Sequence, residues 1–420
     1  MRFRAKTSMV PPGEGGLLST PPSRSVRSKS WYSKRILLVA VVLFVFWFFK
    51  PTGPSIQWSA SSHQYPAAHP QGAHEIIKTS LRFIYPAIED VPALQGLGIY
   101  TLFSRVGADL VSLNHFDEKD PVEQKTKEET QNAALPDNKI KNDFKNRRKY
   151  VYDSTSSSNS PRVVIVSAIN YEKYKLQSLV NLIQNRVDYA IKYDYGVYVR
   201  WTQEFVAEMN DYEFYTDQEK SKWARLFCLR AAMFAFPHAE WFWFLDEDSL
   251  IMNRDVDIAE YLLNPASLDG AMMRSHPLIP PTGIIKSYES TKAEDVELVL
   301  TQSRQKIETG SFVLKNTLIA KGILDTWLDK LFLQYNNFPF GPDSAITHIL
   351  QWHPYFLSKL ALVPARMISS LHNPLVPEEE RETDPISYFS GDLVAQWIEC
   401  NSPDSCESIL ANYVSLLQEP

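Results

Sequence analysis

The chain has 420 residues, enough for one large or two ordinary domains, and 44% of them are hydrophobic. Its formal net charge of -6 argues against general nucleic-acid binding, which normally needs a basic surface. Three cysteines are present, and two of them, Cys400 and Cys406, lie close enough for a local disulfide in an oxidising compartment. A four-ligand structural zinc site is not expected from so few cysteines.

The first predicted element is an apolar segment near the N-terminus. Residues 36–49 read ILLVAVVLFVFWFF and are bounded by Arg35 and Lys50. Many basic residues precede this segment, whereas no Lys or Arg follows Lys50 until Lys78. The asymmetry predicts a signal-anchor transmembrane helix with a disordered cytosolic tail at 1–35 and a lumenal remainder. A cleaved signal peptide is the alternative, although the region before the apolar run is very long for one. The short span favours the thinner Golgi membrane over the plasma membrane.

Residues 50–160 are predicted to form a lumenal stem and linker. The part just beyond the anchor is rich in Pro, Ser, His and Gln and has no apolar periodicity. Residues 81–113 are more apolar, and we expect one or two helices there that pack on the globular part or on a partner. The strongly charged residues that follow end in a serine-rich run at 154–160, which is typical of a linker.

A globular domain is predicted at 161–420, where strand and helix patterns alternate. The expected strands lie at 163–166, 196–201, 241–245 and 311–315, and the expected helices at 172–190, 218–236, 317–335 and from Asp343 onward. This alternation predicts an α/β sheet covered by helices on both faces.

Three carboxylates, Asp246, Glu247 and Asp248, directly follow the apolar strand predicted at 241–245. Ligands of open α/β sheets bind beyond the carboxyl ends of the strands. Two carboxylates spaced i, i+2 after a strand can face one hard cation, and Mg²⁺ or Mn²⁺ prefers such oxygen ligands. The cation would neutralise a pyrophosphate leaving group. A solvated acidic turn is the alternative, but apolar residues on both sides weigh against it.

The sequence around these carboxylates resembles glycosyltransferase family 34, which holds fungal α-mannosyl- and α-galactosyltransferases and plant xyloglucan xylosyltransferases. The segments that carry the resemblance include VVIVSAIN (163–170), DYAIKYDYGVYVRW (188–201), KWARLFCLRAAMFAFPHA (222–239), EWFWFLDEDSLIMN (240–253), IETGSFVLKNT (307–317) and FSGDLVAQWIEC (389–400). The resemblance spans roughly residues 163–406, nearly all of the predicted globular domain. The resemblance implies a GT-A fold, a type II Golgi membrane protein, and a retaining transfer that depends on Mn²⁺.

The resemblance also implies roles for individual residues. Asp246 and Asp248 match the positions that hold the metal and the donor diphosphate. Gly310 and Ser311 match the Gly-Ser element that lines the sugar pocket. Trp223 matches an aromatic position before the long helix, and a place in the core is an equal alternative for it.

Four further positions also correspond to family elements, and three of them depart from the family pattern. Gln396 stands where the family commonly has a His as third metal ligand, and an amide oxygen binds Mn²⁺ more weakly than imidazole does. Glu308 stands where the plant enzymes carry Asn. Asp343 remains from an acidic element and is our candidate for orienting the sugar or the acceptor hydroxyl, with a helix N-cap as the alternative. Arg366 matches a family position and is expected to pair with phosphate or to form a structural salt bridge.

Within the family, the chain is most similar to the fungal Golgi α-1,6-mannosyltransferase subunits of the mannan polymerase complex. This implies transfer of mannose from GDP-mannose to the mannan of N-glycans, with the other mannosyltransferase subunits as partners. We hypothesise front-face attack with the leaving diphosphate as base, with Glu308 or Asp343 as the alternative nucleophile. Two other functions remain open: a weakly catalytic scaffolding subunit, and an α-galactosyltransferase that uses UDP-galactose.

Overall fold

The computed structural model describes residues 76–80, 82–85, 103–106, 109–112, 149–152, 160–206, 209, 212, 214–397, 400 and 402–418. The predicted cytosolic tail at 1–35 and anchor at 36–49 lie outside these residues. Within the described ranges, no helix has both the length and the apolar character needed to cross a membrane.

The part of 81–113 that the structure describes contains strands where we expected helices. β2 (Phe83–Ile84) joins the large sheet beside β7, and β3 (Phe103–Val106) pairs antiparallel with β4 (Asp109–Ser112). Short apolar runs do not distinguish a helix from a strand by periodicity alone. A glycine and an alanine separate the two paired runs, which is a hairpin signal that outweighs apolar content. Upstream of the sheet, β1 (Ile76–Thr79) pairs parallel with β5 (Lys149–Tyr152).

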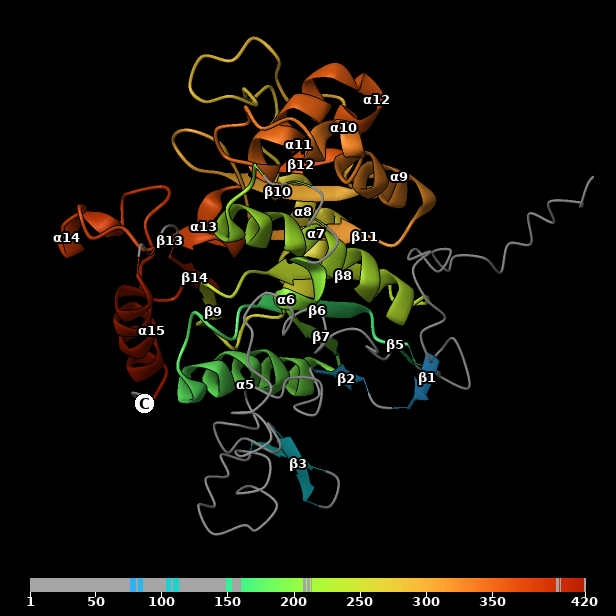
Figure 1. The fold of residues 1–420 in the computed structure, drawn as a ribbon. Helices are drawn as coiled ribbons and strands as arrows, with labels where there is room; N and C mark the ends of the chain where they lie inside the picture. The colour runs from blue at the N-terminus through green and yellow to red at the C-terminus, as the bar shows by residue number, and fades with distance from the viewer. Residues whose placement is uncertain are drawn as a thin grey trace, which may run out of the picture. The chain divides into compact units, whose positions relative to one another are not determined.

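A seven-stranded mixed sheet forms the centre of the described domain (Figure 1). In spatial order its strands are β12 (Leu360–Leu362), β10 (Leu298–Gln302), β11 (Ile307–Lys315), β8 (Trp241–Leu245), β6 (Val163–Ile169), β7 (Gly196–Trp201) and β2. β11 runs antiparallel to both of its neighbours, and the other adjacent pairs are parallel. The predicted strands 196–201 and 241–245 are confirmed with the same bounds, and the sheet confirms the predicted α/β class.

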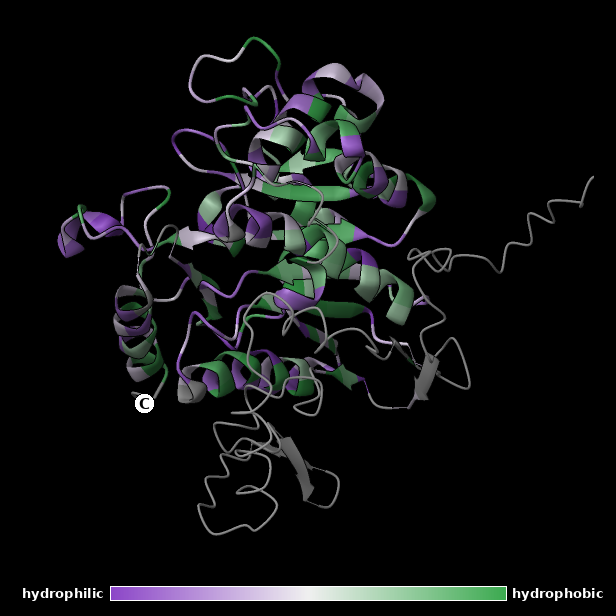
Figure 2. Cartoon of the chain, in the orientation of Figure 1, coloured by the Kyte–Doolittle hydropathy of each residue, from purple (hydrophilic) through white to green (hydrophobic). Residues whose placement is uncertain are grey.

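Both faces of the sheet are buried, which explains the unbroken apolar sequence of β8. Trp243 and Leu245 belong to the apolar cluster on the side of α5 (Leu176–Tyr193). Phe242 and Phe244 belong to the cluster on the side of α7 (Asp217–Ala235). Figure 2 shows that hydrophobic residues make up much of the central strands.

Further helices cover the sheet on the side of β10 and β11. They are α9 (Leu318–Trp327), α10 (Lys330–Leu333), α11 (Pro342–Trp352) and α12 (Pro354–Leu357). The single helix predicted at 317–335 is divided into two, because the Asp329 side chain accepts a hydrogen bond from the Leu331 N–H and caps a new helix. The remaining short elements are α6 (Gln203–Val206), the π-helix η4 (Ala259–Leu263), α8 (Pro265–Ala271), the 3-10 helix η5 (Ala293–Asp295), α13 (Ala365–Ile368) and α14 (Glu378–Arg381).

A small second sheet lies directly after the three carboxylates. β9 (Ser249–Ile251) pairs with β14 (Val394–Gln396), which also pairs with β13 (Ser370–Leu371). The register places Gln396 opposite Ser249. The C-terminal helix α15 (Pro403–Gln418) contacts α5 and carries Cys406, which forms a disulfide with Cys400 as the sequence suggested.

Candidate active site

The three carboxylates lie on the short connection between β8 and β9, held from two sides by backbone hydrogen bonds. The Asp246 N–H donates to the carbonyl of Gly310 in β11 at 2.7 Å. The Trp397 N–H donates to the carbonyl of Asp248 at 2.9 Å. The loop after β8 is therefore fixed between the large sheet and the small one, and it places its carboxylates at the carboxyl end of β8.

A polar cleft opens over this loop. Its lining includes four basic side chains and five acidic ones: Lys173, Lys222, Arg225 and Lys306, and Asp246, Glu247, Asp248, Glu308 and Asp343. Gly310, Phe340, Gln396 and Trp397 complete much of the wall. Basic and acidic side chains in one cleft suit a ligand that carries several anionic oxygens and binds together with a cation.

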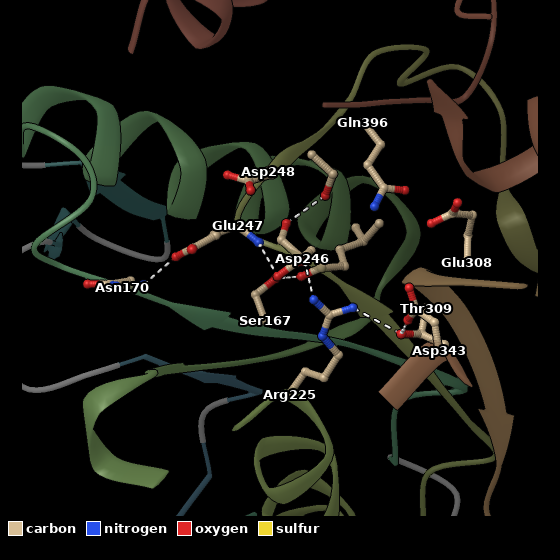
Figure 3. A network of polar contacts seen from close by, with 12 residues as sticks. Ser167, Asn170, Arg225, Asp246, Glu247, Asp248, Glu308, Thr309, Asp343 and Gln396 are labelled. Carbon is tan, nitrogen blue, oxygen red and sulfur yellow. Dashed lines mark hydrogen bonds and ion pairs between the residues drawn. The ribbon is translucent and has the colours of Figure 1, made fainter. Parts of the chain in front are cut away.

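Arg225 links Asp246 to the opposite wall of the cleft (Figure 3). Its guanidinium donates to Asp246 Oδ2 at 2.8 Å and to the Thr309 hydroxyl at 3.0 Å. Thr309 in turn donates to Asp343. Arg225 is itself held on α7, a helix of 19 residues that packs on β6 and β8.

Asp248 accepts hydrogen bonds on both of its carboxylate oxygens. Lys173 Nζ lies 2.5 Å from Oδ2, and the Tyr174 hydroxyl donates to Oδ1 at 2.5 Å. The Tyr174 oxygen also accepts from the Trp397 indole N–H at 2.9 Å. A chain of hydrogen bonds from Trp397 through Tyr174 thus orients Asp248.

Glu247 is buried beside the two aspartates and shares Lys173 with Asp248. Its carboxylate accepts a hydrogen bond from the Asn170 N–H, and its other oxygen lies 3.3 Å from Lys173 Nζ. Burial raises the pKa of Glu247 to about 8, and burial also raises the pKa of Asp248, with Lys173 opposing both shifts and the neighbouring carboxylates adding to them. The buried site therefore disfavours the ionised form of both carboxyl groups.

Glu308 and Asp343 form a second acidic pair, joined by Lys306. Lys306 Nζ lies 2.9 Å from Glu308 Oε2 and pairs with Asp343 as well. Burial raises the pKa of Glu308 to about 7, while Lys306 lowers it and Asp343 raises it. Among the described residues, Glu308 Oε1 is buried without a hydrogen-bond partner. Both oxygens of Asp343 are engaged, by Lys306 and Thr309.

The N-cap alternative for Asp343 does not hold in the structure. Gly341 is the N-cap of α11, and Asp343 lies within the first turn with its side chain on Thr309 and Lys306. Its carboxylate is still favoured there, because negative charge near a helix N-terminus is stabilised by the helix dipole.

Gly310 and Gln396 meet across the cleft wall. A Cβ at Gly310 would collide with the Gln396 amide, so only glycine leaves room for that side chain. Gln396 is buried, and its Oε1 accepts a hydrogen bond from the Ser369 hydroxyl while its Nε2 lies beside Gly310. Coordination of a metal by Gln396 would require its side-chain amide to rotate, because Oε1 is bonded to Ser369 and Nε2 lies on the side of Gly310.

Three residues that the resemblance assigned to substrate binding do not line this cleft in the described structure. Ser311 is fully buried, and its hydroxyl accepts a hydrogen bond from the Trp243 indole at 3.1 Å. Trp223 lies within α7 and not before it, and it is fully buried in the apolar cluster on that side of the sheet. Arg366 forms an ion pair with Asp392 at 2.9 Å and donates to the Glu382 carbonyl, which is the structural alternative raised for it.

No group of three or more His, Cys, Asp or Glu side chains in the described part of the chain is arranged to hold a metal ion. The chemistry of Asp246 and Asp248 nevertheless fits a hard divalent cation, since both offer carboxylate oxygens in a cleft where negative charge is in excess around them. The same oxygens now accept hydrogen bonds from Arg225, Lys173 and Tyr174.

Sequence reasoning missed the basic residues of the cleft. Lys173, Arg225 and Lys306 are far apart in the sequence. Each lies in or beside a segment that carries the family resemblance, but the resemblance assigned roles to other residues. Lys173 follows β6, Arg225 lies in α7, and Lys306 precedes β11, so only the fold brings them to the carboxylates. The one available signal was the need for counter-charges around five clustered acids.

Comparisons with known proteins agree on the family. The model of the galactosyl transferase GMA12/MNN10 family matches residues 159–407. Probable alpha-1,6-mannosyltransferase MNN11 of Saccharomyces cerevisiae is 31% identical over 416 residues, which covers 93% of this chain and 95% of that protein. Probable alpha-1,6-mannosyltransferase MNN10 of the same yeast is 23% identical, covering 67% of this chain and 75% of its own length. An alpha-1,2-galactosyltransferase of Schizosaccharomyces pombe is 24% identical, covering 61% and 66%. The family expected from the motifs is thereby confirmed, and this chain belongs to the galactosyl transferase GMA12/MNN10 family, glycosyltransferase family 34.

Proposed function

We propose that this chain is an α-1,6-mannosyltransferase that uses GDP-mannose and extends the mannan backbone of N-glycans. The observation that carries the proposal is the pair Asp246 and Asp248 at the carboxyl end of β8, in a cleft that four basic side chains line. The choice of mannose rests on the 31% identity to a named α-1,6-mannosyltransferase over nearly the whole chain. The named galactosyltransferases match at lower identity and over a smaller share of the chain.

The donor diphosphate belongs at the Asp246–Asp248 end of the cleft. A divalent cation, Mn²⁺ in our proposal, would be held by the two aspartates and would neutralise the diphosphate as it leaves. Lys222 lines the same cleft and offers a further positive charge to phosphate. Arg225 keeps Asp246 in place from the opposite side.

The sugar and the acceptor belong at the Glu308–Asp343 end. Glu308 lines this end of the cleft, and in this proposal its carboxylate accepts a hydrogen bond from a sugar or acceptor hydroxyl. Asp343 is held by Lys306 and Thr309 and acts as a positioning residue. Retention then proceeds by front-face attack, with the departing diphosphate as base.

We further propose that the domain is the lumenal part of a GT-A enzyme, anchored in the Golgi membrane as a single-pass type II protein and assembled with other mannosyltransferase subunits. The mixed sheet with carboxylates after a central strand supports the GT-A type, and the charge asymmetry about residues 36–49 supports the anchor and its orientation.

Product analysis tests the proposed reaction. The full-length chain in detergent is incubated with an α-mannoside acceptor and either GDP-mannose or UDP-galactose, with Mn²⁺ or with EDTA. We expect Mn²⁺-dependent mannose transfer and an α-1,6 linkage by NMR. Transfer from UDP-galactose alone would establish the galactosyltransferase alternative, and a folded chain that is inactive by itself but restores activity to a partner subunit would establish the scaffolding one.

A further inference from the structure

Lys173 occupies the centre of the acidic cluster. It follows β6 in a turn closed by the hydrogen bond from its own N–H to the Asn170 carbonyl at 3.2 Å. Its Nζ lies 2.5 Å from Asp248 Oδ2 and 3.3 Å from Glu247 Oε1. Only 22% of the side chain is exposed. One ammonium group therefore pairs with two carboxylates at the position where a divalent cation would approach Asp248.

Lys173 and Arg225 are attached to the cluster in different ways. Arg225 has a second anchor in Thr309, and its planar guanidinium projects from a long helix. The ion pairs of Lys173 in the described structure are to Glu247 and Asp248, and its head group rests on a flexible four-carbon stem. The ammonium of Lys173 can therefore move away while its turn stays in place, whereas the guanidinium of Arg225 cannot do so without breaking the link to Thr309.

A divalent cation and the Lys173 ammonium compete for the same oxygen. Asp248 Oδ1 is taken by the Tyr174 hydroxyl, so Oδ2 is the oxygen on which a cation must displace or crowd the ammonium. Two like charges within a few ångströms repel strongly at this site, where the Lys173 and Asp248 side chains are only 22% and 14% exposed. A diphosphate in the cleft removes that conflict, because it gives the displaced ammonium a new anionic partner.

We propose that Lys173 is a resident counter-ion of Asp248 that competes with the divalent cation and gives way when cation and diphosphate bind together. The inference rests on the metal-dependent function proposed above. It assigns Lys173 a regulatory role: the cation alone binds weakly, and the donor diphosphate is required for tight binding. Metal and donor are thereby coupled, each raising the affinity of the other.

The counter-ion role is tested by measuring the binding of Mn²⁺ to the full-length protein in detergent, with and without GDP. Electron paramagnetic resonance of free Mn²⁺ reports the binding. For Lys173→Met we expect about tenfold tighter Mn²⁺ binding without GDP than in the wild type, because a competing charge is gone. We also expect GDP to tighten Mn²⁺ binding by a smaller factor in this variant. Lys173→Arg keeps the charge, and its Mn²⁺ affinity without GDP should stay within about threefold of that of the wild type.

Lys222→Met is the matched control, since Lys222 lines the same cleft and has no ion pair with Asp246, Glu247 or Asp248 in the described structure. It should change Mn²⁺ affinity without GDP far less than Lys173→Met does. Equal Mn²⁺ affinity of wild type and Lys173→Met, or an unchanged effect of GDP, would overturn the counter-ion role alone. Absence of Mn²⁺ binding in both folded proteins would overturn the metal centre itself, and this inference with it.

Discussion

The guanidinium of Arg225 donates a hydrogen bond to Asp246 at 2.8 Å, and it reaches Thr309 on the opposite strand with its other terminal nitrogen. Thr309 donates to Asp343, which Lys306 joins to Glu308. The two acidic ends of the cleft are therefore one connected network, and Figure 3 shows the part of it that runs from Asp246 through Arg225 to Thr309 and Asp343. A change at its centre should disturb both the donor end and the acceptor end.

Replacement of Arg225 is the first prediction. Arg225→Met removes the link and leaves Asp246 without its counter-charge, so we expect kcat/KM to fall about a hundredfold. Arg225→Lys keeps the charge but lacks the fork that reaches both partners, and it should recover only part of the activity. Steady-state kinetics measures both. Arg274→Met removes an arginine paired with Asp269 outside the cleft and should leave kcat/KM unchanged; a similar loss in that control would point to general destabilisation.

The pH dependence of transfer is the second prediction, and it follows from Glu308. Its carboxyl is protonated below, and ionised above, a pKa that burial raises to about 7. If the ionised oxygen accepts the hydroxyl hydrogen bond, kcat/KM rises with pH through a midpoint near that value. Glu308→Gln should lower the activity and flatten this limb of the profile. The exposed Glu289→Gln is the control, and a wild-type limb that survives in Glu308→Gln would assign the titration to another group.

The close approach of Gly310 to Gln396 gives the third prediction. In Gly310→Ala the new methyl group must displace the buried Gln396 amide, so we expect a stability loss of about 1–3 kcal/mol and at least a tenfold loss of activity. Thermal unfolding and kinetics measure the two effects. Gly322 in α9 has open space around its Cβ position, and Gly322→Ala should be neutral or slightly stabilising. Unchanged activity in Gly310→Ala would mean that the cleft wall tolerates the shift of Gln396.

Local sequence patterns predicted the sheet better than they predicted side-chain partners. The strands at 196–201 and 241–245 were predicted with the observed bounds, because apolar runs buried on both faces leave an unambiguous signal. The position of Asp246 and Asp248 after a central strand followed from the same pattern. The helix predicted at 317–335 is interrupted because the Asp329 side chain caps a new helix. Such a side-chain hydrogen bond to the backbone competes with continuation of the first helix, and apolar periodicity does not reveal it.

At the site, the sequence did not predict which side chains from distant segments pair with each other. Arg366 matched a family position, yet only the fold shows that Asp392 lies within 2.9 Å of it and takes its guanidinium. Ser311 lies next to Gly310 in β11, but alternate residues of a strand face opposite sides of a sheet, so Gly310 lines the cleft while Ser311 lies beneath it. A search of the sequence for metal ligands did not select Lys173, because the sequence does not reveal which carboxylate a lysine pairs with.

Calorimetric titration of the full-length protein with GDP-mannose, in Mn²⁺ and in EDTA, tests the central claim most directly. The variant is Asp248→Asn, which removes one negative charge from the cation site, and the control is Asp269→Asn, whose carboxylate is 60% exposed outside the cleft. We predict Mn²⁺-dependent binding of GDP-mannose that Asp248→Asn weakens at least tenfold and Asp269→Asn does not change. Binding of GDP-mannose that is equally tight in EDTA, or unaffected by Asp248→Asn in a folded protein, would contradict a donor site built on Asp246 and Asp248.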